Sequence, residues 1–203
     1  MTSWMKKFAE YFKQREEDYD FRLLADRDYI VRLDGRKFST FMKNRKEKSQ
    51  EFKTAMVNTT IELMKQNPSI KFAYTQSDEI SLVFSVKHGI PYNGRVVKNL
   101  TILSGLCSTI FNKEFPNTDF PHFDARVLET KDDKEIVNNI LWRMRDCERN
   151  WKKKTTNPEL IYGTLIKRTK VMKQSVERTG FEESSRHYSS AAELNEVLGY
   201  NVN

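Results

Sequence analysis

Residues 71–86, KFAYTQSDEISLVFSV, contain two runs of strand-forming residues joined by the polar turn Ser77-Asp78-Glu79. Aromatic and β-branched residues on both sides of a short turn predict a β-hairpin, with strands over 71–76 and 80–86. A turn that only reversed the chain would favour Asn-Gly or Asp-Gly. Two adjacent acids occupy this turn instead, so the hairpin raises the question of whether they belong to a site.

Other elements flank the hairpin in an order that defines a fold. In chain order the sequence predicts helix 1–18, strand 28–33, helix 50–66, the two hairpin strands, helix 96–114, strand 122–128 and a helix from about 132 to 150. From the first strand to the fourth, this order is βαββαβ, the split βαβ arrangement. We therefore predict an α+β protein with a ferredoxin-like core, strand order 4-1-3-2, and additional helices at both ends.

This strand order brings acidic residues together. The third strand lies antiparallel beside the first, so the start of the third neighbours the end of the first. The first strand ends at Asp34, and the third begins at Asp78 and Glu79. We expect these three acids to meet at one edge of the sheet.

Clustered carboxylates are unfavourable unless a cation lies between them or one of them takes a proton. Carboxylate oxygens suit Mg²⁺, which shares its shell with substrate phosphates, and two such ions can promote phosphoryl transfer. Gly35 lets the backbone approach a metal or phosphate closely, and its carbonyl is a further candidate ligand. On these residues alone, a plain Asp34-Gly35 turn and a solvated acidic hairpin are equally good interpretations.

The composition is that of a globular protein with excess positive charge. The 203 residues are 38% hydrophobic and 31% charged, with a formal net charge of +7. Lysine and arginine gather between Arg143 and Lys173, which favours a nucleic-acid partner, although a solvated basic face has the same composition. No apolar run approaches the ~20 residues that cross a bilayer, and the charged N-terminus lacks a signal-peptide core. We expect a cytoplasmic protein that does not bind membranes.

Four stretches give a more specific indication. They are VRLDGRKFSTF (31–41), TQSDEISLVF (75–84), FDARVLE (123–129) and LWRMRDCERN (141–150). In this order and at these spacings they resemble the tRNA-His guanylyltransferase family and its relatives, the 3′–5′ RNA polymerases. The resemblance implies a polymerase-palm-like catalytic domain over residues 1–150, N-terminal helix included, and a basic extension over 151–203 that packs on or beside it. It also implies a homotetramer.

The family adds nucleotides to the 5′ end of tRNA. The resemblance implies three steps: activation of a 5′-monophosphate by ATP or GTP, attack by the 3′-hydroxyl of an incoming GTP, and removal of pyrophosphate. It implies that Asp34, Asp78 and the backbone of Gly35 bind two Mg²⁺ ions, with Glu79 as a third catalytic acid. The implied partners are tRNA, GTP and ATP.

Further residues match family positions that contact substrates. For nucleotide binding they are Lys48 (or Lys46 in a shifted register), Ser77, Arg95, Lys98 and Asn150. Arg36, directly after Gly35, is a further candidate that could hold phosphate or instead pair with Asp78 or Glu79. For tRNA binding we assign Arg143, Arg149, Lys152, Lys153 and Lys154. Basic residues at the start of a helix can hold phosphate oxygens, and a run of lysines suits sequence-independent contact with an RNA backbone.

One departure from the family leaves the substrate open. Eukaryotic tRNA-His enzymes carry a histidine where this chain has Glu148. Dedicated tRNA-His guanylylation and template-directed repair of 5′-truncated tRNAs are therefore both compatible with the sequence.

Two other functions are alternatives. A non-catalytic tRNA-binding module should lack one of the three acids, and all are present. A palm-fold nucleotide cyclase should carry a Gly-Gly-acid turn, which QSDEIS lacks. Trp142 has helical spacing with Val137 and Leu141, so we predict that it packs in the core, with base stacking as the alternative.

Overall fold

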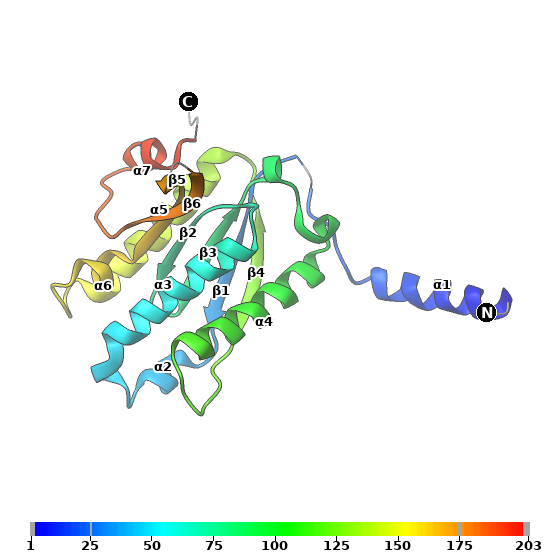
Figure 1. The fold of residues 1–203 in the computed structure, drawn as a ribbon, viewed down its shortest axis with the longest axis horizontal. Coiled ribbons are helices and arrows are strands. Elements are labelled where there is room, and N and C mark those ends of the chain that lie inside the picture. Colours follow the sequence, from blue (N-terminus) through cyan, green and yellow to red (C-terminus); the bar gives the residue numbers. More distant parts are fainter. Residues whose placement is uncertain (1–2, 25, 174–175, 201–203) are drawn as a thin grey trace.

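A computed structural model describes residues 3–24, 26–173 and 176–200 (Figure 1). Its helices and strands are α1 (Ser3–Glu17), β1 (Tyr29–Gly35), α2 (Phe38–Met42), α3 (Ser49–Gln66), β2 (Ile70–Gln76), β3 (Glu79–Phe84), α4 (Val96–Glu114), β4 (Phe123–Glu129), α5 (Asp133–Trp151), α6 (Pro158–Tyr162), β5 (Thr164–Lys173), β6 (Val176–Ser184) and α7 (Ala191–Leu198). Each predicted element is present, with bounds that differ from the expected ones by no more than a few residues.

The strands form one antiparallel sheet in the order β4-β1-β3-β2-β5-β6. Its first four members have the predicted order 4-1-3-2, which is confirmed. The register is the important detail, because Asp34 on β1 lies directly opposite Glu79 on β3 and Asp124 on β4. The sheet therefore aligns acids from three neighbouring strands at one of its ends.

The additional helices predicted at the C-terminal end are present as α6 and α7, but the sequence analysis missed two strands between them. Strand β5 pairs with β2, and β6 pairs with β5, so this segment extends the sheet by two strands. Leu165 and Ile166 at the start of β5 are buried apolar anchors, and basic residues follow them directly. A ribbon at the edge of a sheet needs little apolar alternation, so the sequence pattern that identifies strands is nearly absent.

Alternate residues of the central strands pack into two cores. Val31, Leu33 and Leu82 belong to the core under α3 and α4, which cross one face of the sheet in Figure 1. Ile30 and Val83 point the other way, into the core formed with α5 and α7. This period of two is what a sheet covered on both faces requires.

Helix α1 differs from the helices that cover the sheet, because it stands away from them in Figure 1 and buries none of its residues. Its aromatic face, with Trp4, Phe8, Tyr11 and Phe12, is exposed. Among the described residues, no helix has both the length and the apolar character needed to span a membrane.

Candidate active site

The hairpin turn and the end of β1 meet as the sequence predicts. Gln76 and Glu79 pair across the turn, leaving Ser77 and Asp78 as a two-residue loop. Ser77 has φ of 46°, a conformation that hairpin loops normally assign to glycine. The N–H of Gly35 donates a hydrogen bond of 3.0 Å to the carbonyl of Asp78, which fastens the turn to β1.

Asp78 is a carboxylate in partial burial beside another acid. Its Oδ1 accepts a hydrogen bond of 2.9 Å from the hydroxyl of Ser77. Burial raises the pKa of Asp78 and the nearby charge of Asp34 raises it further, while the hydrogen bond from Ser77 acts in the opposite direction. A cation at this position would relieve both the burial and the repulsion.

Glu79 has a different environment, because an arginine holds it. Arg143 on α5 donates from Nε and Nη2 to the two carboxylate oxygens of Glu79, at 2.7 Å and 2.6 Å, and Arg32 lies 4.0 Å away. The side chains of Glu79 and Arg143 are only 10% and 12% exposed. Burial raises the pKa of Glu79, and the hydrogen bonds and charge of Arg143 counteract this. Glu79 is thus already neutralised by a protein cation.

A pocket of about 550 Å³ opens beside Asp34 and Asp78. Its apolar wall comes from α2 and α3 and includes Phe38, Phe52 and Met56. Its lining residues are Asp34, Gly35, Lys37, Phe38, Ser39, Met42, Lys43, Ser49, Phe52, Lys53, Met56, Val57, Thr75, Gln76, Ser77, Asp78, Trp151, Glu159, Leu160 and Thr164. An apolar hollow with carboxylates and lysines on its wall has the form of a small-molecule site.

Two details define the shape of this pocket. A Cβ on Gly35 would come within 2.3 Å of the Phe38 ring, so only glycine lets the ring lie against the end of β1. Across the pocket, Lys53 on α3 and Glu159 on α6 form an ion pair of 2.5 Å that links the two walls.

The pocket offers few acidic side chains as metal ligands. Within the described residues, no three His, Cys, Asp or Glu side chains cluster so as to hold a metal ion. Mg²⁺, however, is commonly bound by one or two carboxylates plus water and substrate phosphates. Asp34 and Asp78 provide two carboxylates, and Asp78 accepts its side-chain hydrogen bond from a neutral hydroxyl. These residues, with the backbone of Gly35, fit the ion.

The family model described as tRNAHis guanylyltransferase matches residues 9–131. The chain belongs to the tRNAHis guanylyltransferase family. It is 34% identical to an uncharacterized protein of Acanthamoeba polyphaga mimivirus, over 68% of this chain and 58% of that protein. It is 33% identical to the tRNA(His) guanylyltransferase of Debaryomyces hansenii, over 71% of this chain and 58% of the yeast protein. The chain thus spans less than two thirds of the length of these relatives.

The fold is also that of solved structures. A bacterial tRNA(His) guanylyltransferase-like protein in complex with GTP aligns with a TM-score of 0.82, covering 95% of this chain and 98% of that one at 21% sequence identity. This likeness confirms the mixed fold of helices and antiparallel sheet that the family resemblance implies.

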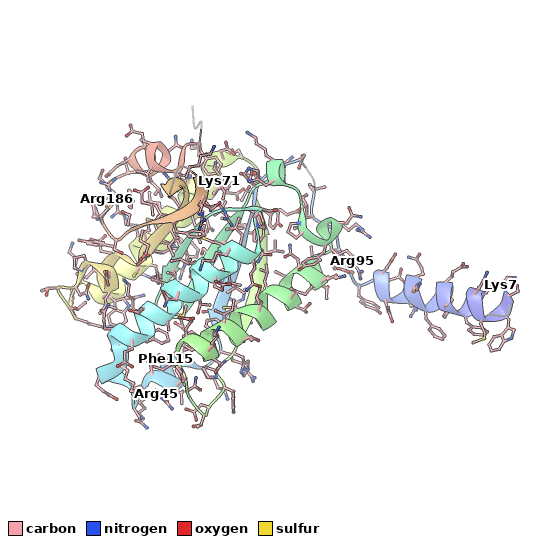
Figure 2. All side chains as sticks on the ribbon, in the orientation of Figure 1. Lys7, Arg45, Lys71, Arg95, Phe115 and Arg186 are labelled. Carbon is pink, nitrogen blue, oxygen red and sulfur yellow. The ribbon has the colours of Figure 1, made fainter. Side chains whose placement is uncertain are left out.

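Other residues expected from the family resemblance do not meet Asp34 in this chain. Arg95 and Lys98 lie at the start of α4, whereas the end of α4 leads towards β4 and the acids (Figure 2 labels Arg95 at one end and Phe115 at the other). A helix of 19 residues is roughly 28 Å long. At its distant end Arg95 forms an ion pair with Asp20, and Lys98 lies over the ring of Tyr92.

The remaining predicted nucleotide ligands lie at varied distances from the pocket. Ser77 lines it. Arg36 directly follows Gly35 in the chain, but its side chain is exposed and its guanidinium lies 3.2 Å from the ring of His122. Lys48 lines a separate hollow between α3 and the end of α4, and the side chain of Lys46 lies outside the described residues. Asn150 is exposed next to Trp151, which lines the pocket.

The expected tRNA contacts divide into two groups. Arg143 points inward and binds Glu79, so its guanidinium is largely buried and does not form part of an exposed RNA-binding surface. Arg149 and the lysines at 152–154 are exposed around the end of α5. Of these, Lys152 pairs with Glu148 at 3.0 Å, and Lys154 lies near the Trp151 ring. RNA contact stays a prediction for them.

Two neighbours of the acids were missed by the sequence analysis. Asp124 and Arg126 lie on β4, and Arg126 contacts Asp34 at 3.6 Å and Asp124 at 3.3 Å. The signal was present, because in strand order 4-1-3-2 the fourth strand is also a neighbour of the first. The prediction that Trp142 packs in the core was wrong, since its side chain is exposed.

Proposed function

We propose that this protein is a 3′–5′ nucleotidyltransferase that adds a nucleotide, guanylate from GTP, to the 5′ end of tRNA. One observation carries the proposal: Asp34 from β1 and Asp78 from the hairpin turn lie together on the wall of a pocket that is apolar on one side. Such a pocket can hold a nucleobase while its triphosphate lies at the acids. Relatives in the family carry the corresponding name, and the bacterial neighbour was solved with GTP and with ATP.

The pocket residues have distinct parts in this proposal. Phe38, Phe52 and Met56 supply the apolar surface for the base. The hydroxyl of Ser77 and the exposed amines of Lys37 and Lys43 lie where phosphate oxygens would be received. The Lys53–Glu159 ion pair links α3 and α6 at the pocket.

Asp34, Asp78 and the backbone of Gly35 would hold two Mg²⁺ ions. When bound, such ions activate an attacking oxygen and stabilise a leaving one in phosphoryl transfer. Glu79 has a supporting role, because Arg143 already engages both of its oxygens. It keeps the start of β3, and with it Asp78, in position against α5.

The proposed reaction has two bond-forming steps, after which pyrophosphate is removed from the added nucleotide. The 5′-monophosphate of the RNA attacks the α-phosphate of ATP, which releases pyrophosphate and leaves an adenylylated 5′ end. The 3′-hydroxyl of GTP then attacks the activated RNA phosphate, so that a 3′–5′ phosphodiester forms and AMP leaves. Asp34 and Asp78 are placed to serve both steps, since each step moves a phosphoryl group past the same pair of carboxylates.

The choice of tRNA depends on residues at the end of α5. Glu148 occupies the position of the histidine in eukaryotic tRNA-His enzymes, and it is engaged by Arg145, Lys152 and His187 at 3.0 to 3.3 Å. A carboxylate that is already paired with three basic side chains is a poor partner for an RNA nucleobase. We therefore favour repair of 5′-truncated tRNAs over dedicated tRNA-His guanylylation.

Assembly forms part of the proposal. Arg95 and Lys98 are remote from Asp34 within one chain, so a nucleotide-binding role for them requires the pocket of another copy in a homotetramer. The exposed aromatic face of α1 provides apolar surface for such contacts. Light scattering on the full chain and on a variant lacking residues 1–17 tests this, since only the full chain should form tetramers.

The experiment for the function uses labelled GTP, Mg²⁺ and 5′-monophosphorylated tRNAs, either full-length tRNA-His or tRNA lacking its first nucleotide, with and without ATP. Extension of the truncated tRNA in the presence of ATP is the expected result. Extension of only full-length tRNA-His would support the dedicated enzyme. Absence of incorporation into any tRNA, with GTP still bound, would contradict the proposed activity.

A further inference from the structure

The side of Asp34 that faces β4 differs from the side that faces the pocket. Towards the pocket, Asp34 neighbours the hairpin turn and the apolar wall. Towards β4, the edge strand of the sheet, it faces Asp124 in register. Arg126, two residues further along β4, reaches back to contact both acids.

Arg126 has the geometry of an anion ligand at an open surface. Its side chain is 56% exposed, while the two carboxylates that it contacts are 37% and 51% exposed. Its distances to them, 3.6 Å and 3.3 Å, are longer than the 2.6 Å of the tight pair between Arg143 and Glu79. A cation held loosely by two exposed acids can exchange one of them for a phosphate, which guanidinium groups bind through two parallel hydrogen bonds.

An exposed aromatic side chain lies on α5 beside the arginine that binds Glu79. The indole of Trp142 is 55% exposed, and the guanidinium of Arg143 lies 4.6 Å from its ring. Arg143 in turn is bound to Glu79, the residue opposite Asp34. An exposed ring is a suitable platform for a nucleobase, and stacking of this kind is how proteins commonly hold unpaired RNA ends.

The proposed reaction has two substrates that must meet at Asp34, and the pocket accounts for one. Resting on that proposed function, we infer that the 5′ end of the RNA is received on the β4 side of Asp34, where Arg126 binds its terminal phosphate and Trp142 stacks on its terminal base. Asp34 would be a ligand of Mg²⁺ when the ion is bound, which would leave the guanidinium of Arg126 available to the phosphate. The pocket then presents GTP from the opposite side.

The test measures equilibrium binding without turnover. The probes are one tRNA lacking its first nucleotide, carrying either a 5′-monophosphate or a 5′-hydroxyl, in buffer with Ca²⁺ in place of Mg²⁺. The variants are Arg126→Ala and Trp142→Ala. Their matched controls are Arg178→Ala, an exposed arginine on the opposite edge strand β6, and Tyr19→Ala, an exposed aromatic residue beyond the end of α1.

We expect the wild-type protein to bind the phosphorylated tRNA about tenfold more tightly than the hydroxyl form, in line with one charge-assisted contact. Arg126→Ala should remove this preference and leave GTP affinity unchanged, while Arg178→Ala should keep it. Trp142→Ala should weaken both tRNAs about fivefold without changing the preference, as the loss of a stacked base predicts. Tyr19→Ala should bind like the wild type.

The outcomes separate this inference from the proposed function. If the wild-type protein extends tRNA but shows no phosphate preference, or if Arg126→Ala retains the preference, the phosphate site on β4 is refuted while the activity stands. If Trp142→Ala binds as Tyr19→Ala does, the stacking platform is refuted. If the wild-type protein binds GTP and tRNA but transfers nothing with Mg²⁺, the proposed function fails whatever Arg126 does.

Discussion

Asp34 and Glu79 lie directly opposite each other on β1 and β3, yet the protein treats their carboxylates differently. Glu79 is buried, and Arg143 donates one hydrogen bond to each of its two carboxylate oxygens. Asp34 is 37% exposed, and its only close cation among the described ion pairs is the loosely held Arg126. Asp78, next to Glu79 in the chain, lies with Asp34 at the pocket.

The difference teaches which acids can bind a metal. A carboxylate whose oxygens are already saturated by a guanidinium gains little from Mg²⁺, whereas two carboxylates that repel each other gain much. We therefore assign Asp34 and Asp78 to the chemistry and Glu79 to the support of the turn. The predictions below separate these two roles.

The largest effect is expected for catalysis at the open acids. Asp34→Ala or Asp78→Ala should reduce nucleotide transfer at least about 10⁴-fold, because each removes a ligand of the metal that stabilises several kcal/mol of transition-state charge. The fold should persist, since removing one of two repelling acids relieves strain. Labelled GTP incorporation and circular dichroism, measured side by side, check both statements, and transfer at the wild-type rate by either variant would remove the metal assignment.

The second effect is expected for stability at the clasped acid. Glu79→Ala leaves the buried guanidinium of Arg143 without its main partner, so we expect the free energy of unfolding to fall by about 3–4 kcal/mol. The double variant Glu79→Met with Arg143→Met removes both charges and should regain most of this loss. Urea unfolding measures all three proteins. If the double variant were as unstable as Glu79→Ala, the charge pair itself would be needed, and the supporting role would have to include more than neutralisation.

A third and smaller effect concerns pH at Asp78. Because the pKa of Asp78 is raised in the folded protein, the folded state binds more protons than the unfolded state once pH exceeds the ordinary aspartate value. The free energy of unfolding should therefore fall as pH rises through this window, and Asp78→Asn should be more stable than the wild type at neutral pH by about 1 kcal/mol.

Urea unfolding without Mg²⁺, from about pH 3 to pH 8, tests the sign. The gap between wild type and Asp78→Asn should close at the acidic end, where Asp78 is protonated in both states. Excess Mg²⁺ at neutral pH should stabilise the wild type more than the variant. A variant less stable than the wild type across this range would show that Asp78 is held by favourable contacts rather than strained.

The open acids could be predicted from sequence because local and topological signals agree on them. Asp34 and Asp78 end or begin strands, and the order of a split βαβ unit leaves few ways to place those strands. The ion pair between Glu79 and Arg143 could not be predicted in the same way. Arg143 and Glu79 are 64 residues apart, and their contact depends on how α5 is rotated about its axis, which no short motif encodes.

Trp142 shows the same limit on α5. The buried face of this helix includes Ile136, Val137, Ile140, Met144 and Cys147. Since each residue turns the helix by about 100°, position 142 lies some 200° from position 140 and therefore on the opposite side. Spacing to Val137 and Leu141 suggested burial, but only the full set of buried positions fixes the direction of the face. Hairpin β5–β6 was missed for the related reason that its basic residues hide its strand pattern.

The smallest effect is expected at Asp146, which shares Arg143 with Glu79. Its Oδ2 lies 3.3 Å from Nη2 of Arg143, one turn away on the same helix, and its Oδ1 pairs with the exposed Arg149. Local pairs of this kind contribute little, so Asp146→Ala should lower the free energy of unfolding by about 0.5 kcal/mol and leave transfer unchanged. Arg143 would still hold Glu79 through both of its hydrogen bonds. A loss as large as that of Glu79→Ala would mean that Asp146 positions the guanidinium, and the contrast would then lie between Asp34 and a three-residue network rather than a single clasped acid.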